Sequence, residues 1–218
     1  MYPLTVKAAL AYVRRTIDEL TSVEDIGMLV SPDAVNLHKI VEGSMVEAVL
    51  KTYEMAPAET LEGLVGKNLS DYIVSDLYDG VATIDIRVPV ARVLSLRCSD
   101  SAITLSDFLP ENSAEARKQL NTYIRGTYDD PRVVVQKIWK GDNMPTLKYY
   151  TTTAESLEDV GFIIEFLPYP VLEEGVVQIA SRMEFPVLNN IVALVLDAYK
   201  ETELAGRYRA KAKEYLES

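Results

Sequence analysis

The sequence predicts an α+β fold, with amphipathic helices at both ends around an antiparallel β-rich middle and a long helical arm at the C-terminus. Apolar residues recur at spacings of three and four near both ends, which is typical of helices. β-Branched and aromatic residues dominate the middle, which is typical of strands. The length and composition fit one mid-sized globular domain or two small ones that share a core, and we expect a single domain over residues 1–218. It would comprise N-terminal helices in 1–80, a β-rich region with one helix in 81–168, and the arm in 186–218.

The N-terminal part predicts two helices. The first spans about Thr5 to Leu20 and carries one apolar stripe. The second begins at the cap Ser31-Pro32 and stops before Pro57. This second helix is apolar on more than one side, so it is either a central core helix, the commoner case, or part of a contact between subunits.

The middle predicts strands separated by turns and one helix. Residues 70–78 predict a short helix, and alternation on both sides of Pro89 predicts two strands or one bent strand, before a short strand at 102–105. Asn112-Ser113 opens a helix through Tyr123. The strongest strand signals are 132–140, 146–152 and 161–167, which predict an antiparallel meander.

The last part predicts two helices after a short uncertain stretch at 176–179. Pro186 occupies a first-turn position and opens a helix with a broad apolar face. Thr202 is a candidate cap for a final helix, whose narrower stripe lies beside basic residues.

The composition excludes much enzyme chemistry. The chain has 33 acidic and 22 basic residues, a formal charge of −11, so most of its surface should repel the phosphates of DNA. One cysteine, Cys98, and one histidine, His38, are too few for an intrachain disulfide or a Cys/His zinc site. The segment 63–68 fits a turn better than a phosphate loop, and His38 with Glu42 fits a surface pair. We therefore expect no catalytic, cofactor-binding or metal-binding residues.

Two segments carry a family resemblance. Residues 189–205, NNIVALVLDAYKETELA, and residues 4–10, LTVKAAL, resemble the C-terminal helix pair and the first helix of head-to-tail connector proteins of tailed bacteriophages. These neck adaptor or ring proteins include those of crAss-like phages of gut bacteria. The resemblance implies an adaptor-like domain that forms a homo-oligomeric ring, usually a dodecamer, between the portal protein and further neck or tail proteins. DNA would pass through the ring without sequence-specific binding during genome ejection.

On this hypothesis the functional residues form interfaces. They are Ile40, Met45, Val49 and Tyr53 of the two-faced helix, Trp139, Tyr149 and Tyr150 of the hairpin, and Tyr208, Arg209, Lys211 and Tyr215 of the arm. We expect a structural virion protein, made in the host cytoplasm and without membrane contact, since the longest aliphatic run, 191–196, is far too short to span a bilayer. Two alternatives stay open: a carboxylate enzyme using a divalent metal, and a monomeric binding module in the host cytoplasm.

Overall fold

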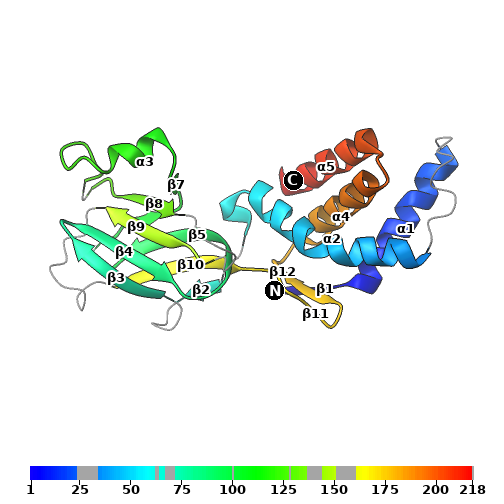
Figure 1. Ribbon diagram of the computed structural model, residues 1–218, viewed down its shortest axis with the longest axis horizontal. Helices are drawn as coiled ribbons and strands as arrows, with labels where there is room; N and C mark the ends of the chain where they lie inside the picture. The colour runs from blue at the N-terminus through cyan, green and yellow to red at the C-terminus, as the bar shows by residue number, and fades with distance from the viewer. Residues whose placement is uncertain are drawn as a thin grey trace. The chain divides into compact units, whose positions relative to one another are not determined.

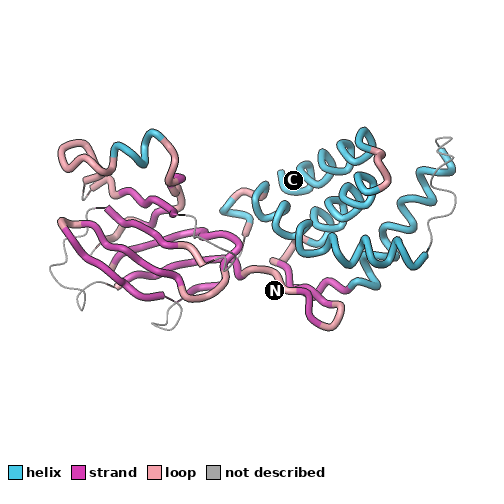
Figure 2. Tube along the Cα trace, in the orientation of Figure 1, coloured by secondary structure: helices cyan, strands magenta, loops and turns pink. Residues whose placement is uncertain are grey.

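The computed structural model describes residues 1–23, 34–61, 64–66, 72–99, 101–127, 129–136, 144–150 and 161–217. Helices lie towards both ends of the chain and antiparallel sheets between them, which confirms the predicted α+β class (Figure 2). The chain divides into two compact units, unit 1 (Met1–Glu62 with Pro170–Ser218) and unit 2 (Gly63–Tyr169). Unit 2 is thus an insertion within the sequence of unit 1. The expectation of a single domain stays a prediction, which is testable by whether the chain unfolds in one transition or in two.

Unit 1 is mainly helical (Figure 1). Thr5 precedes the first helix, and its hydroxyl accepts a hydrogen bond from the backbone N–H of Ala8 at 3.1 Å, as an N-cap does. In order, the elements of unit 1 are β1 (Tyr2–Thr5), α1 (Val6–Val23), α2 (Ala34–Met55), the 3-10 turn η1 (Ala58–Thr60), β11 (Leu172–Glu173), β12 (Val176–Ile179), α4 (Glu184–Ala198) and α5 (Thr202–Glu217).

A small antiparallel sheet joins the two chain segments of unit 1. Strand β1 pairs with β12, and β12 pairs with β11. The turn between β11 and β12 places Glu174 at φ 49° and Gly175 at φ 76°, a left-handed pair that suits a tight hairpin. The sequence pattern did not predict β1, because the partner of this strand lies near the other end of the chain.

Helices α2 and α4 form the centre of unit 1. The Asn190 side chain in α4 donates to the hydroxyl of Thr52 in α2 at 2.9 Å, and both side chains are buried. The Tyr53 hydroxyl accepts the backbone N–H of Ala180, just after β12, at 2.8 Å. These bonds satisfy polar groups within an otherwise apolar core. Helix α5 turns back and packs along α4 (Figure 1).

The described residues of unit 2 form two sheets and one short helix. One sheet has the strand order β2-β10-β5-β6 and the other β3-β4-β9-β8-β7. The only parallel pair among the described strands is β7 with β8. The elements are β2 (Leu64–Gly66), β3 (Tyr72–Tyr78), β4 (Val81–Ile86), β5 (Val90–Cys98), β6 (Thr104–Leu105), β7 (Leu109–Pro110), α3 (Ala114–Lys118), β8 (Arg132–Gln136), β9 (Thr146–Tyr150) and β10 (Phe162–Pro168).

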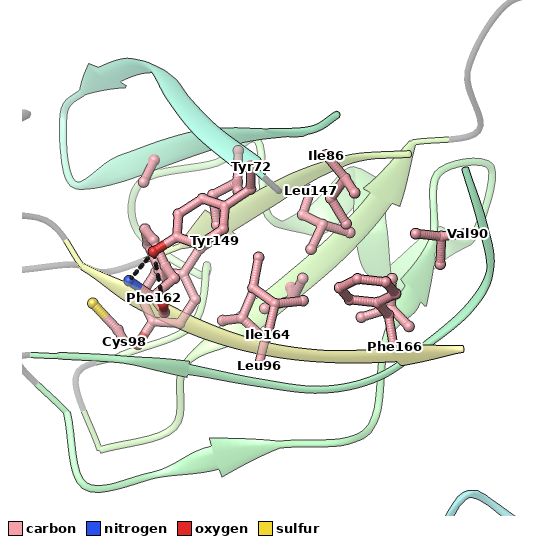
Figure 3. Close-up of a cluster of buried hydrophobic side chains, with 14 residues drawn as sticks. Tyr72, Ile86, Val90, Leu96, Cys98, Leu147, Tyr149, Phe162, Ile164 and Phe166 are labelled. Carbon is pink, nitrogen blue, oxygen red and sulfur yellow. Dashed lines mark hydrogen bonds between the residues drawn. The ribbon is translucent and has the colours of Figure 1, made fainter. Parts of the chain in front are cut away.

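The core of unit 2 lies between its two sheets (Figure 3). Tyr149 of β9 meets Phe162 of β10 edge to face, with ring centroids 5.4 Å apart. The Tyr72 hydroxyl of β3 donates to the Phe162 carbonyl at 2.6 Å and accepts the Phe162 N–H at 3.1 Å. Both contacts join one sheet to the other, so side chains of this core fix how the two sheets face each other.

Two expectations for the middle were wrong. The helix predicted over residues 70–78 is instead strand β3, which pairs with β4 through the turn at Asp79 and Gly80. The strand 161–167 does not continue a meander after β9; β10 pairs with β5 and β2 in the other sheet. In the second case partners from elsewhere in the chain override the local pattern, whereas β3 forms a hairpin with the strand that directly follows it. The pairing of β8 with β9 is antiparallel, as predicted.

Several predicted boundaries also change. Helix α3 is capped by Ser113, as expected, but it ends at Lys118 instead of Tyr123. The segment predicted as a turn at 63–68 contains strand β2, because Leu64 to Gly66 pair with β10. Strands β8 and β9 occupy the described parts of the predicted 132–140 and 146–152, and the remaining residues of both segments lie outside the described residues. The cap predicted at Ser31-Pro32 lies outside the described residues.

Candidate functional site: two exposed apolar surfaces

The two-faced helix places its predicted interface residues mostly inside unit 1. Met45, Val49 and Tyr53 are buried, and Ile40 is half-buried. Burial raises the pKa of the Tyr53 hydroxyl, which also accepts the Ala180 N–H. Val49 and Tyr53 are therefore covered within the same chain, whereas Ile40, Val46 and Leu50 on the second apolar face are half-buried.

The predicted hairpin residues are also covered within their own unit. Tyr149 lies in the core between the sheets, and Tyr150 lies on the outer side of its sheet against Ala116 of α3 and Val134 of β8. Burial raises the pKa of the Tyr150 hydroxyl. Trp139 lies outside the described residues. Both tyrosines are thus buried by contacts within unit 2.

The C-terminal arm contributes one large exposed aromatic. Tyr208 is buried, and Lys211 lies over its ring with the ammonium nitrogen 4.5 Å from the centroid. Arg209 forms an ion pair with Asp197 of α4. Tyr215 is 52% exposed and stacks on Phe185 of α4, with ring centroids 5.6 Å apart. Helix α5 therefore packs along α4. Of the interface residues predicted in α5, Tyr215 and Lys211 are exposed.

Unit 2 has an exposed apolar surface that the sequence did not predict. Tyr123 is 96% exposed and Leu120 is 74% exposed, and Ile124 is also exposed. Tyr78, which is exposed as well, ends β3 directly before Asp79. We call these four residues the loop surface. Leu120 and Tyr123 were assigned to the helix predicted through Tyr123, and their position after the end of α3 explains their exposure.

Hydrogen bonds hold the loop surface in place. The buried Gln119 side chain accepts the Gly126 N–H at 2.8 Å and donates to the Glu115 carbonyl at 3.2 Å. The guanidinium of Arg125 donates to the Asp79 carbonyl at 2.6 Å and lies 3.3 Å from the Asp79 carboxylate. This last pair ties the loop after α3 to the turn that follows Tyr78. The exposed side chains thus stand on an ordered backbone.

Two open hollows flank α3. The larger, about 490 Å³, has Leu120, Val134 and Tyr150 among its apolar lining residues and Arg117 and Lys148 among its charged ones. The smaller, about 280 Å³, lies on the side of Ile124 and Arg132. Both are open and mixed in polarity, and Leu120 lines the larger and Ile124 the smaller. Exposed apolar side chains beside such hollows suit contact with another protein.

Unit 1 has a second exposed apolar surface, at the N-terminal end of α4. Phe185 is 51% exposed and stacks on Tyr215. The Tyr2 hydroxyl donates to the Glu184 carboxylate at 3.2 Å, which brings the start of the chain beside this pair and raises the pKa of Tyr2. We call Met1, Tyr2, Phe185 and Tyr215 the terminal surface.

The residues with catalytic potential are dispersed. His38 and Glu42 are both exposed, with their side chains 4.0 Å apart, as the sequence predicted for a surface pair. Cys98 is buried at the end of β5. Within the part of the chain that the structure describes, there is no group of three His, Cys, Asp or Glu side chains suited to a metal ion. Asp79 instead binds Arg125.

A search of protein-family models and of curated proteins found no match to this chain. Among the described residues, no helix is both long enough and apolar enough to cross a bilayer. The functional candidates are therefore judged by the exposure and the chemistry of the residues themselves. The two exposed apolar surfaces are where the described part of the molecule is best suited to bind another molecule.

Proposed function

We propose that the protein is a structural virion protein that forms a ring in the neck of a tailed bacteriophage, between portal and tail. In this proposal the ring is homo-oligomeric, usually a dodecamer, and provides a channel for genome passage. Its function depends on geometry and interfaces, not on catalytic turnover. The observation that carries the proposal is the helix pair α4 and α5, formed by the segment that resembles the C-terminal pair of connector proteins.

The packing of the resembling segments supports the proposal. The segment 189–205 spans most of α4, the turn at Lys200 and the start of α5, and 4–10 spans the start of α1. Helices α1, α2, α4 and α5 pack together in unit 1 (Figure 1). Segments from opposite ends of the sequence therefore form a single helical unit.

Charge and exposed aromatic residues are consistent with this role. A protein with a formal charge of −11 would repel DNA over most of its surface, which would let DNA slide through a channel without being retained. The loop surface and the terminal surface supply exposed Tyr, Phe, Leu and Ile side chains, the residue types suited to protein contacts. Each unit has one such surface.

The experiment that tests the proposal is the location of the protein in purified virions. We expect mass spectrometry to find the chain in DNA-filled particles, and gold-labelled antibody to mark the junction of head and tail. A chain found only in the lysate of infected cells, or labelled elsewhere on the particle, would contradict the proposal. Adding Mg²⁺, Mn²⁺ or Ca²⁺ should leave the melting temperature unchanged, since a metal enzyme would be stabilised by its ion.

A truncation of the arm is unsuitable as a test. Deleting residues 206–218 would remove the buried side chains of Tyr208, Ala212 and Leu216 and uncover α4. The shortened chain would lose stability together with any contact. Substitutions of exposed side chains test an interface without this ambiguity.

A further inference from the structure

The strands at the borders of the described sheets differ in length, and β3 is the exception. The border strands are β1 and β11 in one sheet, β2 and β6 in the second, and β3 and β7 in the third. Five of these six strands have two to four residues, whereas β3 has seven. Short border strands are one way in which proteins prevent pairing along a sheet edge. Strand β3, which lies at the border of its sheet (Figure 1), therefore has the longest edge among the described strands.

Part of the backbone of β3 points away from its neighbour β4. Tyr78 and Val81 flank a two-residue turn, which makes them a hydrogen-bonded pair. Along β4, such pairs then alternate with pairs that are not hydrogen-bonded to β3. The N–H of Ile86, at the far end of β4, agrees with this alternation, because it donates at 3.1 Å to the carbonyl of Pro145, directly before β9.

The alternation leaves unpaired groups along β3. The backbone N–H and C=O groups of Tyr72, Val74 and Leu77 face away from β4, and no described residue provides a backbone partner for them on that side. Val74 and Leu77 are three residues apart because the register shifts at Ser75, where β3 has a bulge. A bulge limits regular pairing, but the groups on both sides of it stay accessible. The edge of β3 thus offers three unpaired positions to a further strand.

The core of unit 2 is incompletely covered at this edge. Val74 and Leu77 are half-buried and pack against the core between the sheets. On the other face of β3, Ile73 is 38% exposed and Tyr78 is 77% exposed. A strand added to β3 would cover both faces with alternate side chains. Tyr78 also belongs to the loop surface, so the edge of β3 and the loop surface are continuous.

We propose that β3 is a strand-addition site, at which an extended segment of a partner protein pairs with β3 and becomes the sixth strand of its sheet. Main-chain hydrogen bonds supply the affinity in this mode of recognition, and side chains at alternate positions supply the specificity. The segment should therefore carry apolar residues at alternate positions, which would cover Val74 and Leu77. The proposal goes beyond the neck role and does not depend on it.

A second copy of this chain is a less suitable occupant of the edge. Pairing of two β3 strands would place a bulge in both strands and bring the exposed carboxylate of Asp76 into the contact twice. The formal charge of −11 also opposes the close approach of two copies. A segment of a partner protein can be regular and free of acidic residues.

The first measurement is amide hydrogen exchange by NMR on the full chain alone. If the edge is open, the amides of Val74 and Leu77 should exchange at least about tenfold faster than those of Ile73 and Tyr78, whose N–H groups face β4. Equal protection of the two pairs of amides would show that the chain itself covers the edge, and would overturn the proposal.

The second measurement adds a probe strand to the full chain. The probe is a synthetic peptide of alternating valine and threonine, as long as β3 and with a lysine at each end. The control peptide has the same sequence with every amide N-methylated, which removes its N–H donors. At up to about millimolar concentration, the probe should shift and protect the amides of Val74 and Leu77, and the control peptide should do neither. Unchanged amides, or equal effects of the two peptides, would overturn the proposal.

Two substitutions of Val74 separate the role of its backbone from that of its side chain. Val74→Pro removes the outward N–H and leaves the bonds to β4, because proline is accepted on edge strands in this orientation. Val74→Ala, the matched control, removes the side chain and keeps the N–H. We expect Val74→Ala to bind the probe nearly as the wild type does, and Val74→Pro to bind it at least about fivefold more weakly. Equal binding by the two variants would contradict the proposal.

Circular dichroism checks the fold of both variants, and if Val74→Pro does not fold, the two peptides on the wild-type chain decide. Sedimentation velocity tests the other occupant. Self-association that the probe reverses would show that a second copy occupies the edge, and would overturn the proposal. Failure of the neck role is a separate result, because a chain missing from virions would still bind the probe at β3.

Discussion

Unit 1 and unit 2 are built from the chain in opposite ways. Unit 1 combines two segments from the ends of the sequence, and the apolar pattern of each of its helices lies within that helix's own residues. Unit 2 is one continuous segment, yet its strands pair across long separations, such as β5 with β10. Continuity along the sequence therefore does not make a region easier to predict. What matters is whether each element is specified by its own residues or by a distant partner.

The two units also stabilise their interiors differently. In unit 1, side-chain amide and hydroxyl groups join helices, as Asn190 does with Thr52. In unit 2, apolar side chains of two sheets meet, and the Tyr72 hydroxyl bonds to the backbone of Phe162 (Figure 3). Each unit has a buried core of its own. Whether the chain unfolds in one transition or in two can therefore be tested by changing one core at a time.

The largest effect is expected from core truncation. Ile164 of β10 and Ile191 of α4 are both almost fully buried, the first in unit 2 and the second in unit 1. Ile164→Ala and Ile191→Ala should each lower the free energy of unfolding by about 2–5 kcal/mol, because a cavity adds to the lost burial. Differential scanning calorimetry measures both. If the units unfold separately, each substitution should move only the transition of its own unit.

The paired substitutions are controls for each other. If a single transition moves by the same amount with either variant, the chain unfolds as one cooperative domain, as the sequence led us to expect. Two transitions that respond separately would instead assign a domain to each unit. A shift much below 1 kcal/mol for either variant would contradict the described burial of that isoleucine.

A smaller effect is expected from removing one hydroxyl in each core. Tyr72→Phe removes two bonds to the backbone of Phe162, whereas Tyr53→Phe removes the bond from the Ala180 N–H. A buried polar group left without its partner costs about 1–3 kcal/mol, so each variant should be destabilised by about this amount. Urea unfolding measures the change. Amide hydrogen exchange should become faster at Phe162 in the first variant and at Ala180 in the second; equal exchange rates would show that these bonds contribute little.

The helices of unit 1 could be predicted because their signals are local. The first helix, the stop before Pro57 and the position of Pro186 in the first turn of α4 all follow from spacing and from proline geometry. Strand β1 could not be predicted, since it exists only through β12. The helix predicted over 70–78 failed for a different reason: β3 forms a hairpin with β4, which follows directly after the turn at Asp79 and Gly80, and this local turn signal was not used.

The candidate surfaces were only partly predictable. Tyr215 was expected at an interface, and the structure places it in the terminal surface. Tyr149 and Tyr208 look the same in sequence but are buried. Tyr123 and Leu120 were missed because their spacing matches a helix, and the early end of α3 depends on Gln119, whose side chain bonds to Gly126 further along the chain. Exposure of an apolar residue is a tertiary property that sequence spacing does not encode.

The smallest changes in stability are expected from substitutions at two glycines, one in each unit. Gly206 lies within α5, and a Cβ there would meet nothing within 4 Å. Gly206→Ala should therefore stabilise the protein by about 0.4–1 kcal/mol, because alanine loses less backbone freedom in a helix. Gly126→Ala should destabilise it, since the new Cβ would lie 2.8 Å from the Asp130 carbonyl oxygen and 2.9 Å from Cγ of Arg132.

The two substitutions should change the stability in opposite directions, and thermal unfolding measures both changes. Gly126 donates its N–H to Gln119, so displacing it should also disturb the backbone that holds Tyr123 and Ile124. Amide hydrogen exchange at Tyr123 and Ile124 should then become faster in Gly126→Ala and stay unchanged in Gly206→Ala. Unchanged exchange at both residues in Gly126→Ala would show that the bond between Gly126 and Gln119 does not hold this backbone in place.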